Sequence, residues 1–308
     1  MQPWEQTPVE KARAAILEEL RGSEGPVSGQ ALSQQLAIGR NAVWKHVEAL
    51  REMGYRIEGK TRRGYRLLSI PEAPLPFEIT HGLATHTLGR SVIFLPVAGS
   101  TNDVIRDLAK QGAPEGLLVV ADSQLAGRGR RGHMWESPAG GGLWVSVLLR
   151  PALAPAQAPL LALLAAVAVA VAIRKQTGLE ALVKWPNDVL ISGRKVCGVL
   201  VEMAAESESI HYVVIGMGIN VNLTREQLPE ALRSSATSLR EECRGRVSRV
   251  ALLRTILREM ELRYDALVTS GPESLVEENR SLSAVLGEGD LRGQCIWCAA
   301  GAGDRYRE

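Results

Sequence analysis

The chain is poor in the features that mark several specialised classes of protein. It has 4 cysteines in 308 residues, 2 phenylalanines and a formal net charge of only +2. A charge this small does not by itself indicate nucleic-acid binding. The N-terminus, MQPWEQTPVEKARA, lacks the basic and then apolar order of a signal peptide. We therefore expect a cytoplasmic protein with reduced thiols at Cys197, Cys243, Cys295 and Cys298.

Neither a membrane span nor a metal site is predicted. The apolar run APLLALLAAVAVAVAI at residues 158–173 is shorter than the roughly 20 residues that cross a bilayer. It predicts a buried helix that ends near Gly178, and no membrane partner is expected. Cys295 and Cys298 have no second pair and no histidine partner to complete a zinc site, so no metal ligands are assigned.

The N-terminal residues predict three helices followed by a hairpin. Apolar residues recur at helical spacing in three stretches, namely Val9, Ala12, Ile16, Leu17 and Leu20, then Leu32 and Leu36, then Val43, Val47 and Leu50. Ser28 is a good N-cap for the second helix, and Gly54 ends the third. Residues 55–67, YRIEGKTRRGYRL, alternate around two glycines and predict a two-stranded wing.

This arrangement is typical of a winged helix-turn-helix. The third helix presents polar and basic side chains at its N-terminal end. The wing carries five basic residues between 56 and 66 against one acid, which suits the phosphate backbone of DNA. The alternative is a three-helix protein-binding module with merely solvated arginines. The predicted DNA contacts are Arg40, Asn41, Trp44, Lys45, Lys60, Arg62 and Arg63.

Beyond residue 70 the pattern changes to α+β. SIPEAPLPFEI contains three prolines and predicts a linker at 71–78 between a DNA-binding domain at 1–70 and a larger domain at 79–272. Alternating and β-branched runs predict a mixed sheet with strands at 91–98, 116–122, 142–149, 181–185, 195–203 and 210–220. Helices are expected near 101–111, 158–176 and 250–269.

The glycine-rich stretch AGRGRRGHMWESPAGGG, residues 126–142, matches G-x-G-x-x-G in spacing. A dinucleotide-binding loop must open a helix, whereas this one leads into an alternating, β-branched strand. Arg128, Arg130 and Arg131 make the loop cationic, and its glycines make it mobile. We interpret it as a flap over an anion. The alternative is a solvated basic loop.

Two further motifs favour the flap. GSTNDVIRDLAK places the Ser100 and Thr101 hydroxyls at the start of a helix, and VKWPND places Lys184 at the end of a strand. With GRGRRG and GMGIN in this order, they resemble the biotin protein ligase family over about residues 9–285. The N-terminal winged helix narrows the resemblance to the bifunctional ligases that are also biotin-operon repressors.

The resemblance implies a reaction and its residues. Biotin and ATP, with Mg²⁺, would form biotinyl-5′-adenylate, and biotin would then pass to a lysine of the biotin carboxyl carrier protein of acetyl-CoA carboxylase. Lys184, Arg128 and Arg130 would be catalytic. Biotin would contact Ser100, Thr101, Asn102, Gln124, Gly127, Arg128, Lys184, Gly198 and Gly216, with Gly218 also lining its pocket. ATP would contact Arg128, Arg130, Arg131, Trp135, Lys184, Asn187 and Asn220.

The resemblance also implies operator DNA as a partner and a homodimer when the adenylate is bound. Family members end in an SH3-like barrel, which needs about 40 to 50 residues. Residues 273–308 offer too few, so we expect a reduced or altered C-terminal segment. Two alternatives stay open on this fold: a lipoate or octanoate ligase, and a ligand-sensing repressor without ligase activity.

We predict that replacing Arg62 and Arg63 with Ala weakens binding to specific and random DNA alike. Phosphate contacts carry no sequence information, and their loss reduces the number of counterions released on binding. Fluorescence anisotropy over a salt series would show a shallower dependence of the binding constant on salt. An effect confined to the specific operator, with an unchanged salt slope, would mean that these arginines read bases or shape.

Overall fold

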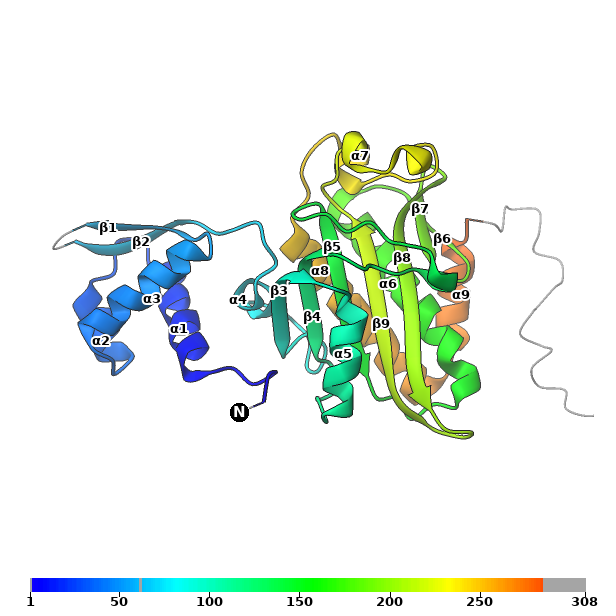
Figure 1. Cartoon of the computed structure of the whole chain (residues 1–308), viewed down its shortest axis with the longest axis horizontal. Helices are drawn as coiled ribbons and strands as arrows, with labels where there is room; N and C mark the ends of the chain where they lie inside the picture. Colours follow the sequence, from blue (N-terminus) through cyan, green and yellow to red (C-terminus); the bar gives the residue numbers. More distant parts are fainter. Residues whose placement is uncertain (1, 61–62, 285–308) are drawn as a thin grey trace, which may run out of the picture.

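The computed structural model describes residues 2–60 and 63–284, and these form two units joined by a short connection (Figure 1). The smaller unit contains α1 (Pro8–Gly22), α2 (Gly29–Gln35), α3 (Arg40–Glu52), β1 (Arg56–Lys60) and β2 (Gly64–Ser69). The two strands are antiparallel, and Val27, just before α2, exchanges two backbone hydrogen bonds of 2.8 Å with Tyr65 of β2. The wing is thus tied to the helices, and a winged helix-turn-helix is formed as predicted.

Local capping and apolar spacing account for the three helices of this unit. Thr7 and Glu10 form a reciprocal capping box at the start of α1, and the Ser28 hydroxyl accepts a bond from the backbone N–H of Ala31 at 3.0 Å. The predicted residues from Ile16 to Leu50 form one core, whereas Ala12 is half-buried outside this cluster and Val9 is 47% exposed. Its assignment to the core was wrong because residues 8–11 of α1 all face solvent.

The larger unit is built on one mixed sheet, as predicted. Among the described residues seven strands join it, in the order β3-β4-β5-β9-β8-β7-β6, with β3 and β4 parallel and the other pairs antiparallel. The strands are β3 (Val92–Ala98), β4 (Leu118–Gln124), β5 (Gly142–Leu149), β6 (Ala181–Lys184), β7 (Asp188–Ile191), β8 (Arg194–Ala205) and β9 (Ile210–Asn220).

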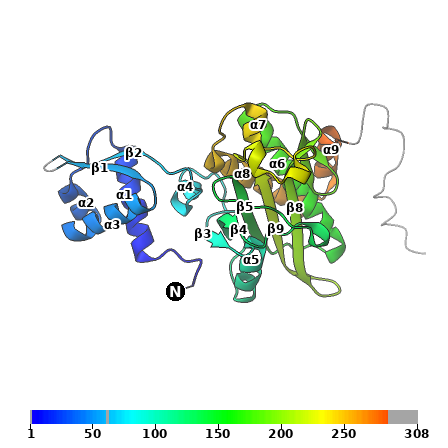
Figure 2. The ribbon, with the colours of Figure 1, turned by 45° about the horizontal axis from the view of Figure 1, so that its top comes forward.

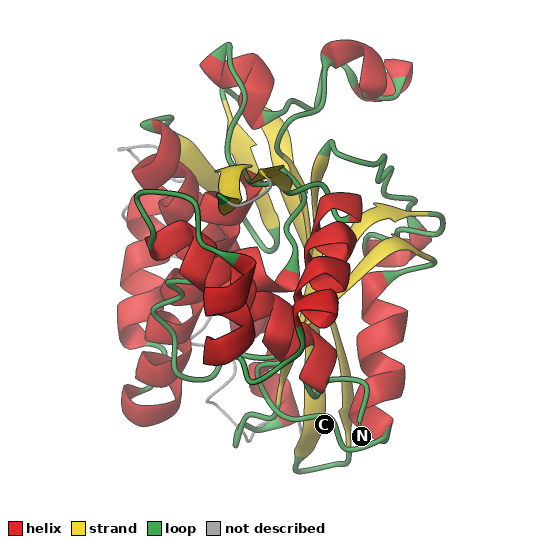
Figure 3. Cartoon of the chain, turned by 90° about the vertical axis from the view of Figure 1, so that its left-hand side faces the viewer, coloured by secondary structure: helices red, strands yellow, loops and turns green. Residues whose placement is uncertain are grey.

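Helices cover both faces of this sheet (Figures 2 and 3). On one face α5 (Thr101–Lys110) packs against β4, β5 and β9 through a small apolar cluster. The main core lies on the other face, under α6 (Ala158–Thr177), α8 (Arg249–Ser270) and α9 (Glu273–Leu282). The short α4 (Pro76–Thr80) contacts the edge strand β3 and α8, and α7 (Leu239–Cys243) lies beyond the ends of the strands (Figure 1). Because the sheet is packed on both faces, it holds the loops at its ends in defined positions.

Helix α6 is the predicted buried helix. It is long and apolar enough to cross a membrane. Its most apolar 18-residue stretch has a mean hydropathy of 2.3, but 72% of that stretch is buried inside the protein. Gly178 ends it in the left-handed conformation at φ 73°. Its apolar residues pack against the sheet and α8 rather than forming an exposed surface.

Four elements lie where the sequence pattern gave no such prediction. β7 follows directly after the predicted strand that contains Lys184, α4 begins inside the expected linker, and α7 follows β9. Residues 273–282, expected to open a C-terminal segment, form α9, whose Leu275 and Leu282 join the core. The rest of that segment, residues 285–308 with Cys295 and Cys298, lies outside the described residues.

A buried carboxylate joins the two units. Glu78 of α4 is fully buried and accepts hydrogen bonds from Arg21 Nη2 at 2.8 and 3.0 Å and from the Tyr55 hydroxyl at 3.0 Å. Arg254 of α8 donates to the backbone carbonyl of Glu78. Burial and the neighbouring Glu78 carboxylate raise the pKa of Tyr55, so its hydroxyl stays a donor. The winged helix is therefore attached to the sheet unit by a desolvated polar contact.

We predict that Glu78→Gln lowers the free energy of unfolding by about 2 kcal/mol, since hydrogen bonds to a buried charge are worth about 1.5–3 kcal/mol. Urea unfolding followed by circular dichroism would measure it. Glu72→Gln is the matched control, because Glu72 also contacts the other unit, through Arg246, but both side chains are at least half exposed. Equal stability of the two variants would contradict the role assigned to Glu78.

Candidate active site

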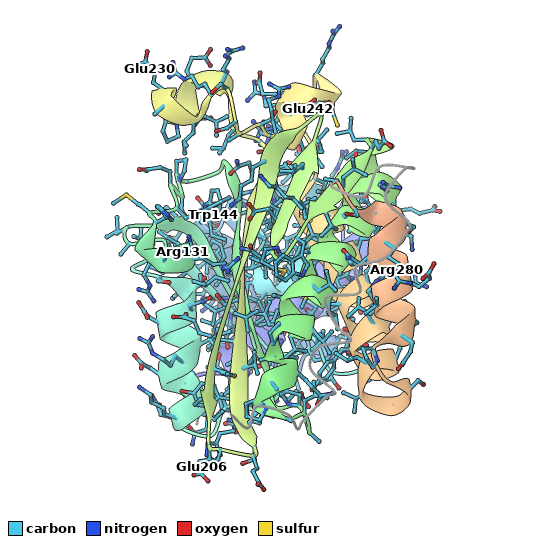
Figure 4. The ribbon with its side chains drawn as sticks, turned by 90° about the vertical axis from the view of Figure 1, so that its right-hand side faces the viewer. Arg131, Trp144, Glu206, Glu230, Glu242 and Arg280 are labelled. Atoms are coloured by element: carbon cyan, nitrogen blue, oxygen red, sulfur yellow. The ribbon has the colours of Figure 1, made fainter. Side chains whose placement is uncertain are left out.

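One cavity of about 760 Å³ opens at the end of the sheet where the predicted motifs meet. Its wall is formed by the start of α5, the glycine-arginine loop, the β6–β7 turn, the middle of β8 and β9, and the segment after β9. In Figure 4 Arg131 lies beside the sheet, between Glu230 and Glu242 at one end and the β8–β9 turn at Glu206 at the other. The predicted residues that line it are Ser100, Thr101, Asn102, Gln124, Arg128, Arg130, Arg131, Trp135, Lys184, Asn187, Gly198, Gly216 and Asn220.

A continuous hydrogen-bond network fixes the polar wall at the start of α5. The Gln124 carbonyl accepts from the Thr101 backbone N–H at 2.8 Å and hydroxyl at 3.1 Å. The Ser146 hydroxyl lies 2.7 Å from Thr101 Oγ1 and 2.6 Å from Asn102 Oδ1. Ser100 begins the helix without a side-chain capping bond, although it is buried. Its hydroxyl is therefore available to a polar ligand.

The glycine-arginine loop closes on itself as a small hairpin. Gly129 donates to the His133 carbonyl at 2.7 Å, and Trp135 donates to the Gly127 carbonyl at 2.9 Å. A side chain at Gly127 would place its Cβ 2.4 Å from the Trp135 carbonyl oxygen. Gly127 does not line the cavity, so its contribution here is to allow this close pairing. The loop reaches the β6–β7 turn through Arg130, whose Nη1 lies 3.0 Å from Asn187 Oδ1.

The glycines of β8 and β9 leave room for large side chains of the protein itself. A Cβ on Gly216 would lie 2.2 Å from Asn102 Oδ1, and one on Gly218 would lie 2.4 Å from Trp135 Nε1. Gly198 is paired with Gly218 across the two strands and also lies under the indole. In the structure Gly218 supports Trp135 and does not itself line the cavity.

The cavity is strongly cationic. Arg128, Arg130, Arg131, Lys184 and Lys195 line it, against two carboxylates, Glu136 and Asp188. Such a wall attracts and holds anions. Lys184 lies at the end of β6 opposite Asp188 in the hairpin register, and within the described residues it forms no ion pair.

Several site residues were not identified from the sequence. Lys195 Nζ lies 2.7 Å from Asp188 Oδ1 and 5.3 Å from the centre of the Trp135 ring. Ser146 and Glu202 complete the polar network, the latter by accepting from Asn102 Nδ2 at 2.6 Å. Strand alternation alone placed Ser146 among apolar neighbours and gave no sign of its role. A lysine inside GRKVCGV next to KWPND was the available signal for Lys195.

The chemistry available to the site follows from these groups. Burial raises the pKa of the Cys197 thiol, which removes it as a thiolate nucleophile. In residues 2–60 and 63–284 no group of three or more His, Cys, Asp or Glu is arranged to hold a metal ion. What the cavity offers is an array of cationic and amide groups around space for a medium-sized ligand, which suits stabilisation of negative charge.

The predicted DNA-contacting residues that the structure describes are all exposed. Arg40, Asn41, Trp44 and Lys45 are exposed on α3, and Arg63 is exposed on the wing. Lys60 is exposed but pairs with Glu58 at 3.0 Å, so part of its charge is compensated. Arg62 lies outside the described residues.

Comparison with known proteins identifies the family. The family model described as Biotin/lipoate A/B protein ligase matches residues 94–220, and a helix-turn-helix domain model matches residues 13–66. The bifunctional ligase/repressor BirA of Bacillus subtilis (strain 168) is 43% identical over 258 residues, which are 83% of this chain and 79% of that protein. The chain belongs to the bifunctional ligase/repressor BirA family.

Two further relatives extend the comparison. BirA of Escherichia coli (strain K12) is 30% identical over 274 residues, 86% of this chain and 83% of that protein. The biotin protein ligase from Aquifex aeolicus, solved in complex with biotin and ATP, is 30% identical with a TM-score of 0.55, and the match covers 64% of this chain and 83% of that one. The resemblance seen in the motifs is thereby confirmed for both the winged helix and the sheet unit.

We predict that Gly218→Ala displaces the Trp135 indole, because a Cβ at 2.4 Å from Nε1 forces the ring to move. In protein labelled with 5-fluorotryptophan, the fluorine resonance missing from Trp135→Phe should shift. Gly99→Ala is the control, since nothing lies within 4 Å of a Cβ there. An unmoved Trp135 resonance in Gly218→Ala would show that the indole does not rest on this glycine in solution.

Proposed function

We propose that this chain activates biotin with ATP to biotinyl-5′-adenylate, transfers biotin to a lysine of a carboxyl carrier protein, and represses transcription from a biotin-regulated operator. The observation that carries the ligase half is the single cavity in which the STN, GRGRRG, KWPND and GMGIN motifs meet. Family membership supports both halves, since the relatives at 43% identity are named bifunctional ligase/repressor.

The polar wall at the start of α5 is proposed to bind the ureido ring of biotin. A ureido group has both donors and an acceptor, and this wall offers hydroxyls at Ser100 and Thr101 and amides at Asn102 and Gln124. Hydrogen bonds with one another and with Ser146 hold Thr101, Asn102 and Gln124 in fixed positions before a ligand arrives. Such fixed donors and acceptors discriminate against ligands that lack the matching groups.

The cationic wall is proposed to catalyse adenylation. The biotin carboxylate attacks the α-phosphorus of ATP and pyrophosphate leaves, so two anions must approach one another. Lys184, Arg128 and Arg130 would offset this repulsion and stabilise the charge that grows in the transition state. A carrier lysine amine then attacks the acyl carbon of the mixed anhydride and AMP leaves. No covalent intermediate with the enzyme is needed.

The nucleotide is proposed to lie between the loop and the segment that follows β9. Trp135 would contact the adenine, with Arg131, Asn187 and Asn220 toward the rest of the nucleotide. Asn220 is buried, its Nδ2 donates to the Thr237 carbonyl at 3.0 Å, and it lines the cavity. We propose that Mg²⁺ enters with ATP, whose phosphate oxygens would supply most of its ligands and whose charge it would partly neutralise.

The repressor half is proposed to act as an adenylate-bound homodimer on operator DNA. A dimer presents two winged helices, which suits two half-sites related by a two-fold axis. Glu78 links each winged helix to the sheet unit, so ligand-dependent pairing of the sheet units would set the spacing of the DNA-binding surfaces. Protein and operator would meet in the cytoplasm, consistent with the cytoplasmic location expected from the sequence.

The test is an avidin blot after incubation of the protein with carrier domain, ATP and biotin. In parallel reactions lipoate or octanoate replaces biotin, and mass spectrometry of the carrier detects its modification. Lys184→Ala should abolish biotin-dependent pyrophosphate release while weakening biotin binding only moderately, because its charge is needed most in the transition state. Lys110→Ala, on the exposed side of α5, should behave as wild type.

Each outcome assigns the function. Labelling of the carrier by lipoate alone would mean that the chain is a lipoate ligase. Binding of biotin without pyrophosphate release by the wild type would leave a ligand-sensing repressor. Near wild-type pyrophosphate release by Lys184→Ala would remove that lysine from the mechanism.

A further inference from the structure

Arg128 is held by a carboxylate that does not belong to the cavity wall. Its Nη1 lies 2.7 Å from Asp103 Oδ2 and its Nη2 lies 2.6 Å from Asp103 Oδ1, a two-point fork. Asp103 also pairs with Arg106 at 2.5 Å on the same helix. A second carboxylate, Glu202, lies 3.9 Å from Arg128 Nη2. Arg128 lines the cavity, whereas Asp103 and Glu202 contact Arg128 without lining the cavity themselves.

The fork fixes the Arg128 guanidinium but uses only some of its hydrogen-bond donors. A planar two-point contact sets both the position and the orientation of an arginine. It uses two of the five N–H groups, so three remain for a ligand on the cavity side. The Arg128 hydrogen bond lowers the pKa of Asp103, and the Asp103 hydrogen bond raises the pKa of Arg128. Both groups therefore stay charged at neutral pH, and the contact persists there.

The fork also connects the two walls of the site. Asp103 lies in the first turn of α5, directly after Thr101 and Asn102, which carry the polar network. Asn102 in turn donates to Glu202, the second carboxylate near Arg128. The loop has other anchors: Ala126 donates to the Gly99 carbonyl at 2.8 Å, Arg130 contacts Asn187, and Trp135 packs on Gly218. The Asp103 fork is the side-chain contact that joins Arg128 to the first turn of α5.

We propose that Asp103 is a positioning residue that holds the Arg128 guanidinium, and with it the first limb of the loop, at the cavity wall before ligands bind. The positioning concerns the ligand-free protein, and only its effect on adenylation rests on the proposed function. The opposite hypothesis is that Asp103 competes with anionic ligands for Arg128. It predicts that loss of the Asp103 charge makes ATP bind more tightly.

Limited trypsin digestion of the ligand-free protein tests the positioning directly. Trypsin cleaves after arginine, and an arginine held in a fork is a poor substrate unless the segment opens. Cleavage after Arg128 should become faster in Asp103→Asn and faster still in Asp103→Ala, because Asn keeps one acceptor. Asp107→Asn is the matched control, one turn along α5 and, within residues 2–60 and 63–284, paired only with Lys110 at 3.3 Å. Mass spectrometry of the fragments identifies the site, and thermal melts check that the variants fold.

Adenylation kinetics test the consequence. Asp103→Asn should lower kcat/KM for ATP in biotin-dependent pyrophosphate release by about 10- to 100-fold, the scale expected when a catalytic group is displaced by about 1 Å. In an Arg128→Ala background the same substitution should have no further effect, because Asp103 acts through that arginine. A simple loss of stability would add to the Arg128→Ala defect instead.

The outcomes separate the two hypotheses. Unchanged trypsin cleavage in Asp103→Asn, or tighter ATP binding, would overturn the positioning role. Faster cleavage together with no pyrophosphate release by the wild type would support the positioning role and refute the proposed adenylation. Faster cleavage with lowered kcat/KM and no additional loss beside Arg128→Ala is the expected result.

Discussion

A site that binds two anions must hold several cations close together before either anion arrives. Arg128, Arg130, Arg131, Lys184 and Lys195 share one cavity wall, and their mutual repulsion would scatter flexible side chains into solvent. The structure limits this with contacts behind the wall. Lys195 is paired with Asp188, and Arg128 with Asp103. Within the described residues Lys184, Arg130 and Arg131 form no ion pair, which leaves their charges for the ligands.

The sheet makes this arrangement possible because its central strands are rigid where the site lies. β9 is flanked by β5 and β8, and its residues from Val213 to Met217 are buried. Gly216 and Gly218 interrupt its row of side chains, and Asn102 and Trp135 fill the space above them. The same strand therefore supports the polar wall through one glycine and the aromatic side chain through another. A Cβ at either position would disturb a different part of the site.

Many helices and strands could be predicted because the sequence patterns that indicate them are local. Capping at Ser28, apolar spacing in α3 and α6, and alternation in β5 and β9 depend on neighbours in the sequence, and the structure has these elements. β7 was missed because four residues between two turns are too short for a clear alternation. α9 was missed because α6 and α8 bury it, and those contacts form only in the folded protein.

The cavity residues divide in the same way. Ser100, Gln124, Arg128 and Lys184 stand in motifs, so resemblance was enough to select them. Asp103, Ser146 and Glu202 act through partners that lie at least 25 positions away, and no spacing rule connects them. The sequence showed that the loop was cationic, and the structure shows what compensates that charge.

The buried Glu78 contact gives the two units a common geometry. In a repressor, the distance between two DNA-binding surfaces has to match the spacing of half-sites on the DNA helix. A loose proline-rich connection between independent units would average over many spacings. Residues 76–80 instead form a helix, and its carboxylate is bonded to Arg21 and Tyr55 on one side while its backbone is bonded to Arg254 on the other. Rotation between the units is thereby limited, so a change in how two sheet units pair would be passed to the winged helices as a change in their separation.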